Sequence, residues 1–241
     1  MKFSILTPSF NSVTYIENAI LSAKAQGYSD WEHIIFDGGS TDGTIEVLKK
    51  FPHLIWTSGP DKGQSDAMNK AFKKSSGDII IYLNADDELK PDALRNFYNT
   101  FAENQDADIV VADLEVNNHG ELYINTPSTD LRQLLTYYWP CIFPANPVSY
   151  AYKRSLQKKI GNFPLDNHYT MDYWFLLRAF LNGRAVKANF VTGTFNLDGT
   201  NKSADETVVK EWLKKVRDRF VYRYFYRPQV TRFLIRRLFR F

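Results

Sequence analysis

The sequence predicts an α/β fold in which an open, mostly parallel sheet is flanked by helices on both faces. Three observations lead to this prediction. Short apolar runs of strand length alternate with segments of helical periodicity up to about residue 112. Glycine, aspartate and asparagine gather directly after several of these runs, where a strand would enter a turn. The alternation stops after residue 113, so a second, smaller region follows.

The elements follow one another in a regular order. Each apolar run has the length and the β-branched or aromatic composition of a buried strand. The predicted strands cover residues 3–7, 33–36, 54–57, 79–83 and 109–112. Between them, apolar side chains recur at helical spacing, and Pro91 stands where proline favours the first turn of a helix. The predicted helices cover residues 13–26, 45–51, 65–74 and 91–101.

The region after residue 113 has a different pattern. Residues 117–120, Asn-Asn-His-Gly, indicate a β-hairpin. The charge-free stretch 133–152 contains three prolines, which disfavour a membrane-spanning helix and favour an aromatic loop or strand. We therefore divide the chain into residues 1–113, residues 114–215 of the same domain, and a tail of residues 216–241.

Composition narrows the class of protein. Of 241 residues, 44% are apolar and 24% are charged, as in an ordinary globular protein. The single cysteine, Cys141, cannot form an internal disulfide or a cysteine-based zinc site, which favours a reducing compartment. The apolar run at the N-terminus is too short for a signal peptide. We expect a cytoplasmic protein.

Positive charge is concentrated in the tail. Residues 216–241 contain eight arginines and one aspartate among many aromatic residues, so the tail carries a charge of +7 and the rest about −4. Pro228 should end one helix and start another, and on the second helix Val230 and Leu234 lie opposite Arg232 and Arg236. Three interpretations stay open: an anionic membrane surface, which we favour, a terminal helix packed on the body, or RNA. RNA is the weakest of the three, so we expect no nucleic acid partner.

Polar residues follow four of the predicted strands. These strand ends are residues 7–9, 37–40, 58–61 and 84–87. Ligands of an open parallel sheet bind beyond the carboxyl ends of its strands, so four such ends together indicate a site. Asp86 and Asp87 supply hard oxygen atoms for Mg²⁺ or Mn²⁺ that would bridge a diphosphate, although either could instead cap the following helix.

The order and spacing of these segments resemble family 2 glycosyltransferases of the GT-A fold. The matching segments are residues 7–11 (TPSFN), 37–44 (DGGSTDGT), 60–63 with 66–70 (PDKG and DAMNK) and 83–87 (LNADD). The resemblance implies transfer of a sugar from a nucleotide-diphosphate donor, with UDP the family-level expectation, to an acceptor hydroxyl with inversion. The implied acceptor is a lipid-linked (polyprenyl) oligosaccharide or a polysaccharide.

The resemblance also implies roles for individual residues. Asp86 would be the ligand of a divalent metal, Mn²⁺ or Mg²⁺, and Asn84 stands where the family's motif has its first Asp. Pro8 and Asp37 would contact the nucleoside base. The full implied nucleotide-binding set is Thr7, Pro8, Ser9, Asp37, Gly39, Asp66, Asn84 and Ala85.

The reaction needs a base, and the resemblance places it at Asp172. Residues 170–178 resemble the segment in which the family has this aspartate, with Met171 where Glu is common. The structural alternative is an aspartate that interacts with the dipole of a helix N-terminus. A later loop, residues 195–203, resembles one that closes over the diphosphate; it lacks the usual histidine, for which Asn196, Asp198 or water could substitute.

Other functions fit less well. Residues 7–12 lack the glycine-rich phosphate loop expected of a nucleotidyltransferase or a nicotinamide dehydrogenase. A catalytically silent sugar-nucleotide or membrane-surface binding protein stays open because Asn84 and Met171 replace acids. Our interpretation is an inverting glycosyltransferase (a hexosyltransferase) held on the inner face of the cell membrane by its tail. On the acceptor side, which comprises residues 137–152 and the helix of Asp172, four aromatic residues could stack on sugar rings, line a path for a lipid tail or form a plain core: Tyr137, Tyr138, Trp139 and Trp174.

Overall fold

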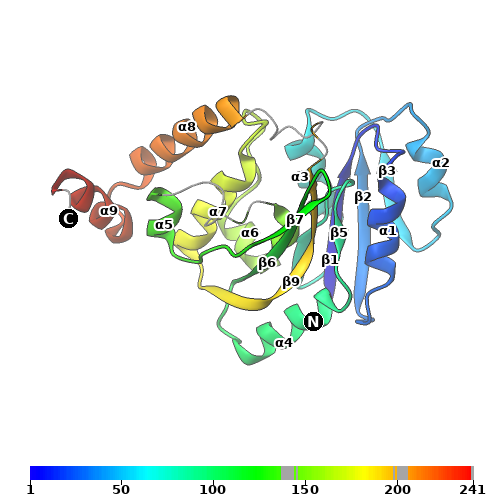
Figure 1. Ribbon diagram of the computed structural model, residues 1–241, viewed down its shortest axis with the longest axis horizontal. Coiled ribbons are helices and arrows are strands. Elements are labelled where there is room, and N and C mark those ends of the chain that lie inside the picture. The colour runs from blue at the N-terminus through cyan, green and yellow to red at the C-terminus, as the bar shows by residue number, and fades with distance from the viewer. Residues whose placement is uncertain (137–143, 145, 198, 200–205, 240–241) are drawn as a thin grey trace.

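The computed structural model describes residues 1–136, 144, 146–197, 199 and 206–239. These residues form one sheet of nine strands, in the order β3-β2-β1-β4-β8-β6-β9-β5 with β7 beside β6 (Figure 1). The strands are β1 (Phe3–Ser9), β2 (Trp31–Asp37), β3 (Leu54–Ser58), β4 (Ile79–Tyr82), β5 (Glu88–Leu89), β6 (Ile109–Asn118), β7 (Glu121–Asn125), β8 (Tyr150–Lys153) and β9 (Ala185–Leu197). The α-helices are α1 (Ile16–Lys24), α2 (Thr44–Lys49), α3 (Gln64–Lys74), α4 (Ala93–Glu103), α5 (Leu131–Thr136), α6 (Arg154–Ile160), α7 (Met171–Asn182), α8 (Glu206–Tyr224) and α9 (Pro228–Phe239).

The N-terminal half of the sheet is parallel, as predicted. Strands β3, β2, β1 and β4 pair in parallel, with Ser9 beside Asp37 and Asp37 beside Ser58. This register brings the polar strand ends to one edge of the sheet. The predicted α/β fold is therefore confirmed, with element bounds that differ from the sequence-based ones by a few residues.

The other half of the sheet is mixed. Strand β8 lies between β4 and β6 and is antiparallel to both, whereas β6 and β9 are parallel. The predicted hairpin is confirmed between β6 and β7: His119 and Gly120 have φ values of 52° and 92°, as a two-residue turn of type I′ requires. Strand β6 crosses residue 113, so the two predicted parts share a strand.

Helices cover both faces of the sheet because its strands are apolar on both sides. On β1, Leu6 packs toward α3 and α7, and its neighbour Ile5 packs on the opposite face toward α1 and α4. Ile80 and Ile81 of β4 alternate in the same way. The sheet is thus the central layer of the molecule (Figure 1).

The C-terminal helices pack on the body of the protein. The predicted break is confirmed, since α8 ends at Tyr224 and α9 begins at Pro228. Val216, Val230 and Phe233 are buried in the same core as α7. The apolar stripe of the second tail helix, which we expected to face a membrane, is therefore at least partly used for packing, and α8 crosses the predicted boundary at residue 215. None of the helices in the described ranges is both long and apolar enough to span a bilayer.

The core around Phe175 gives a prediction about stability. Phe175 of α7 is fully buried, stacks on Phe163 with ring centroids 4.7 Å apart, and lies 4.8 Å from the ring of Tyr152. Phe175→Ala should lower the free energy of unfolding by about 3–5 kcal/mol, measured by chemical denaturation, because it leaves a cavity. Leu21→Ala on the exposed side of α1 is the control, expected within about 0.5 kcal/mol of wild type. Equal effects would contradict the assignment of Phe175 to the core.

Candidate active site

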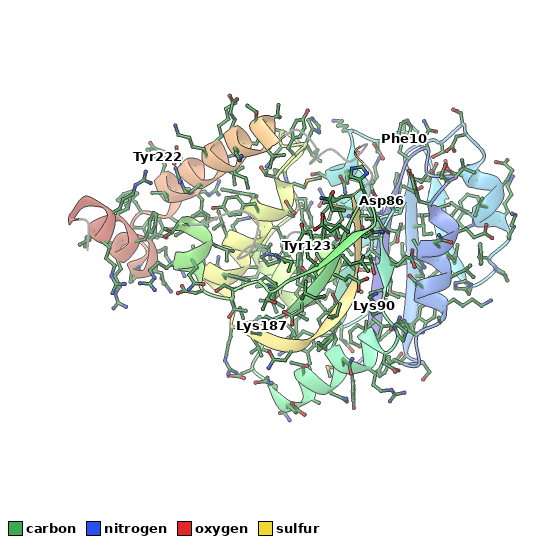
Figure 2. All side chains as sticks on the ribbon, viewed as in Figure 1. Phe10, Asp86, Lys90, Tyr123, Lys187 and Tyr222 are labelled. Atoms are coloured by element: carbon green, nitrogen blue, oxygen red, sulfur yellow. The ribbon has the colours of Figure 1, made fainter. Side chains whose placement is uncertain are left out.

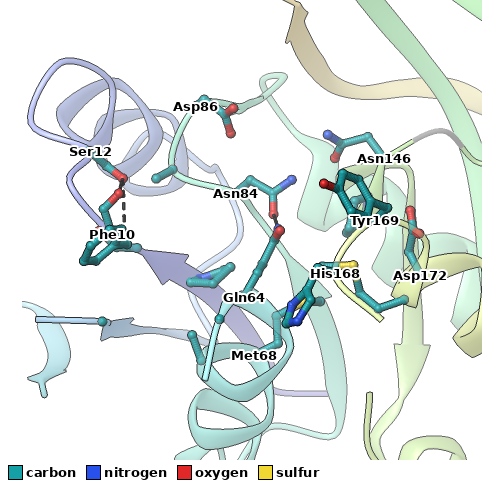
Figure 3. Close-up of a pocket in the computed structure, with 18 of the residues that line it drawn as sticks. Phe10, Ser12, Gln64, Met68, Asn84, Asp86, Asn146, His168, Tyr169 and Asp172 are labelled. Carbon is teal, nitrogen blue, oxygen red and sulfur yellow. Dashed lines mark hydrogen bonds between the residues drawn. The ribbon is translucent and has the colours of Figure 1, made fainter. Parts of the chain in front are cut away.

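A cavity of about 660 Å³ opens at the polar edge of the sheet (Figure 3). Its walls come from the end of β1, the loop after β4, the start of α3, the N-terminus of α7 and the first half of α8. Six residues of the predicted site line it: Pro8, Ser9, Asn84, Ala85, Asp86 and Asp172. The fold thus brings the predicted metal ligand and the predicted base to one cavity, although they lie far apart in the sequence.

Asp37 lies beneath this cavity and does not line it. Its buried carboxylate accepts hydrogen bonds from the backbone N–H groups of Gly39 and Ser40, at 3.0 and 2.9 Å, and from the hydroxyls of Ser40 and Ser58. Gly39 has a φ of 89°, which a glycine adopts without strain. Asp37 therefore fixes the turn after β2 to the end of β3, and its neighbour Gly38 reaches the cavity wall.

Thr7 and Asp66 also lie outside the cavity lining. The Thr7 hydroxyl is buried and lies 2.9 Å from Nε2 of His33, and burial lowers the pKa of His33 to about 3. Asp66, in the first turn of α3, accepts from the Lys62 backbone and pairs with Lys70 at 3.1 Å. Through these contacts Thr7 joins β1 to β2, and Asp66 joins the loop before α3 to that helix.

Asp87 joins three segments behind the cavity. Its Oδ2 accepts hydrogen bonds from the side-chain amides of Asn84 and Asn146, at 2.9 and 2.7 Å. Its Oδ1 accepts from the backbone N–H of Asn196 at 3.4 Å, and the Asn196 amide donates to the backbone carbonyl of Asp86. Burial, with the nearby charge of Asp86, raises the pKa of Asp87 well above its usual value. Neither aspartate caps α4, whose N-cap residue is Asp92.

The position of Asp86 suits a metal ion that is bound partly by the protein and partly by a bound substrate. Within the described ranges, no group of three or more His, Cys, Asp or Glu residues is arranged to hold a metal ion. Mg²⁺ and Mn²⁺ commonly bind through one or two carboxylates and complete their shell with substrate phosphates and water. Asp86 can provide such a carboxylate at the cavity wall. Asn196 of the later loop bonds the Asp86 backbone instead, and Asp198 lies outside the described residues.

Asp172 lies on the opposite wall, in the first turn of α7. It is half-buried beside Met171, and desolvation raises its pKa to about 7, against a smaller lowering effect of hydrogen bonds that include the Tyr173 backbone N–H. Tyr150 is close enough that the Asp172 charge, after burial, contributes to raising the pKa of its phenol. A carboxyl group of this pKa can take up a proton near neutral pH, as a general base must.

Several lining residues were not predicted or were predicted weakly. The side-chain amide of Gln64 donates to the side-chain oxygen of Asn84 at 3.1 Å. The side-chain amide of Asn146 donates to Asp87, and an Asn-Pro pair was the only signal in the sequence for Asn146. His168 lines the cavity, and Tyr169 does so while stacking on Trp212 of α8. Trp174 belongs to the core rather than to the cavity, and residues 137–139 lie outside the described ranges.

Comparison with known families identifies this arrangement. A family model described as Glycosyl transferase family 2 matches residues 4–175, which include both Asp86 and Asp172. The chain belongs to this family. The match begins in β1 and ends in α7, so in this family 2 glycosyltransferase it covers the segments that carry Asp86 and Asp172 but not the part of the cavity wall that α8 supplies.

Curated relatives of this family 2 protein are bacterial. An uncharacterized glycosyltransferase of Nostoc sp. is 30% identical over 187 residues, which are 69% of this chain and 54% of the relative. A PGL/p-HBAD biosynthesis glycosyltransferase of Mycobacterium bovis is 29% identical over 225 residues, 89% of this chain and 83% of the relative. A putative teichuronic acid biosynthesis glycosyltransferase, TuaG of Bacillus subtilis, is 35% identical over 97 residues, 38% of each chain. The chain thus spans about half the length of the Nostoc relative.

Solved structures share the fold of this family 2 protein. TarS of S. aureus, in complex with UDP-GlcNAc, superposes with a TM-score of 0.71 at 20% identity, over 90% of this chain and 65% of that one. The mannosyltransferase PcManGT of Pyrobaculum calidifontis, in complex with GDP-Man and Mn²⁺, gives 0.64 at 21% identity, over 87% and 60%. These likenesses confirm the predicted GT-A type fold.

The contact between Asn84 and Asp87 yields a prediction. Asn84→Asp restores the acid of the family motif but replaces an amide donor with a second carboxyl group 2.9 Å from Asp87. We expect this variant to lose about 1–3 kcal/mol of stability in chemical denaturation, because two acceptors then face each other. Adding Asp87→Asn should recover part of the loss, since one amide again faces one carboxylate at this contact, although the new amide also turns toward the amide of Asn146. Strictly additive losses in the double variant would contradict this contact.

Proposed function

We propose that this protein is an inverting glycosyltransferase that moves a sugar from a nucleotide-diphosphate donor to an acceptor hydroxyl. The observation that carries the proposal is the common cavity of Asp86 and Asp172, which offers a metal-binding carboxylate on one wall and a group with the pKa of a base on the other. Family membership and the named functions of the relatives support the same reaction class.

The donor would occupy the part of the cavity next to the strand ends. Pro8, Ser9, Asn84 and Ala85 line this part, and Asp37 and Gly39 shape the turn behind it. Asp86 would hold Mn²⁺ or Mg²⁺ together with the donor diphosphate, and a cation bound there would neutralise the charge of the leaving group. We favour UDP because TarS was solved with UDP-GlcNAc, although PcManGT was solved with GDP-Man and Mn²⁺.

The acceptor would approach from the α7 side. Asp172 would accept the proton of the acceptor hydroxyl as that oxygen attacks the anomeric carbon, while the diphosphate leaves from the opposite face. A single displacement of this kind inverts the anomeric centre. The part of the cavity wall that the later segments of the chain form, which includes His168 and Tyr169, would position the acceptor sugar.

We also propose a place for this reaction. The mycobacterial and Bacillus relatives are named for the biosynthesis of PGL/p-HBAD and teichuronic acid, which supports a saccharide or polyprenyl-linked acceptor for a bacterial surface polymer. The enzyme would work at the inner face of the cell membrane, where the arginine-rich tail meets anionic lipid.

The donor assignment predicts a thermal shift. UDP-sugars with Mn²⁺ should raise the melting temperature of the wild type, because a ligand at about 100 times its Kd stabilises by about 2.7 kcal/mol. EDTA, or Asp86→Asn, should remove most of this shift, and Asp92→Asn at the α4 N-cap should leave it unchanged. A panel of UDP-, GDP- and dTDP-sugars tests the nucleotide. No shift with any of them would contradict the donor site.

The base assignment predicts a pH-dependent rate. With the pKa of Asp172 raised to about 7, kcat should rise with pH through about 7, because only the carboxylate accepts a proton. Asp172→Asn should lower kcat by about 10²–10⁴-fold and abolish this pH dependence, in a donor-consumption assay with a membrane extract as acceptor source.

Stability supplies the control for this experiment. A raised pKa in the folded state stabilises the wild type at low pH, and this contribution is lost as the pH rises through about 7. Asp172→Asn should therefore become more stable relative to wild type between about pH 4, where the unfolded-state carboxyl ionises, and about pH 7, with no further change above that pH. Donor turnover that survives in Asp172→Asn would refute the role of Asp172. Absence of turnover in the wild type, together with donor binding, would favour a silent sugar-nucleotide binding protein.

A further inference from the structure

Exposed aromatic rings gather where α8 turns into α9. We call this segment, Tyr222 to Pro228, the α8–α9 corner. Tyr222, Phe225 and Tyr226 are 84%, 59% and 64% exposed, and Tyr222 is the most exposed large apolar or aromatic side chain within the described ranges (Figure 2). Three such rings within five residues are more than the singly scattered apolar side chains of an ordinary surface, and they indicate a contact surface.

The corner is held rigidly. Arg227 donates hydrogen bonds to the carbonyl of Leu181 and to the side chain of Asn182, at 3.3 and 3.4 Å, and so joins the corner to the end of α7. The Thr231 hydroxyl donates to the Phe225 carbonyl at 2.6 Å. Val230 is fully buried directly after the corner. The exposure of the rings is therefore a feature of a packed structure and not of a frayed terminus.

Positive charge surrounds the rings. Residues 219–239 contain six arginines and no acidic residue. Arg223 lies within the corner, and Arg232, Arg236 and Arg237 are exposed on α9, the helix that follows it. Of the acids near the C-terminal helices, Asp218, the closest along the chain, pairs with Arg217, and Asp166 pairs with Arg219. An occupant of this surface must therefore accept aromatic rings and supply negative charge.

We propose that the α8–α9 corner is the surface by which this protein contacts an anionic lipid bilayer. Tyrosine rings prefer the boundary between headgroups and acyl chains, and arginines there meet lipid phosphates. This differs from the sequence-based expectation, because the rings of the corner make the apolar contact, whereas Val230 of the α9 stripe is buried and Leu234 packs against the core. The inference deepens the proposed function, because it rests on that function where it connects the membrane surface to a membrane-borne acceptor.

The geometry of α8 connects this surface to the cavity. Val209 and Leu213 near the start of α8 line the cavity, and Tyr224, the last residue of α8, lies within the corner. At 1.5 Å per residue, Leu213 and Tyr224 are about 17 Å apart along one continuous helix. A bilayer at the corner would therefore hold a lipid-linked acceptor at a fixed distance, along α8, from the cavity wall.

Vesicle flotation with the full chain tests the proposal. Wild type should float with vesicles of phosphatidylglycerol and phosphatidylcholine and stay unbound with phosphatidylcholine alone, and high salt should weaken binding. Tyr222→Ser/Phe225→Ser/Tyr226→Ser should reduce the partition coefficient by about tenfold or more. Arg232→Gln/Arg236→Gln/Arg237→Gln should do the same through lost electrostatic attraction.

Matched controls remove similar groups at the other end of the molecule. Leu21→Ser/Ile55→Ser removes exposed apolar side chains, and Lys50→Gln/Lys73→Gln removes exposed cations; both should bind like wild type. Melting temperatures of all variants show that each is folded, and the donor-induced shift should survive in the corner variants. Vesicle binding without any donor effect in the wild type would refute the proposed function and leave this inference intact.

Three results would overturn the inference. They are a wild type that does not bind anionic vesicles, corner variants that bind as tightly as wild type, and a wild type that binds single-stranded RNA through the corner but not vesicles. The last result would assign the corner to nucleic acid.

Discussion

The buried carboxyl group of Asp87 is the constraint on which the geometry of the cavity depends. It lies one residue after the predicted metal ligand and accepts hydrogen bonds from residues 59 and 109 positions further along the chain. A buried acceptor left without its donors would cost free energy, so the loop after β4, the segment before β8 and the end of β9 are held together. Asp86 therefore has a defined position, because the adjacent residue Asp87 is buried and the Asn196 amide donates a hydrogen bond to the backbone carbonyl of Asp86.

The two walls of the cavity differ in polarity, and this difference separates the roles of their carboxyl groups. Asp86 lies among asparagine amides and the backbone groups of a loop, in surroundings that suit a cation with its phosphates. Asp172 lies at the start of an apolar helix beside Met171, and desolvation brings its pKa to about 7. Two carboxyl groups with such different surroundings suit two tasks, charge compensation and proton transfer.

The sequence was sufficient for the parallel half of the fold and for the location of the site. Local periodicity predicts each of β1 to β4, and parallel pairing then brings the ends of these strands together. For strand β8 the sequence predicted only a loop or strand somewhere in residues 133–152, because its place between β4 and β6 depends on distant partners. The orientations of Thr7 and Asp37 also depend on distant partners, His33 and Ser58, which a motif does not reveal. The tail was predicted to be helical, but only packing shows which of its apolar residues are already buried.

The two departures from the family pattern act in the same direction. Asn84 supplies an amide donor to Asp87 where the family's Asp would add a carboxylate beside Asp86 and Asp87. Met171 is buried next to Asp172 where Glu would add another negative charge at that wall. Each replacement removes an acid from a cavity that, in the proposed reaction, must admit a diphosphate. At α7 the apolar methionine leaves desolvation as the cause of the raised pKa of Asp172. The missing acids are thus compatible with catalysis, because the remaining carboxyl groups have the surroundings that their proposed tasks require.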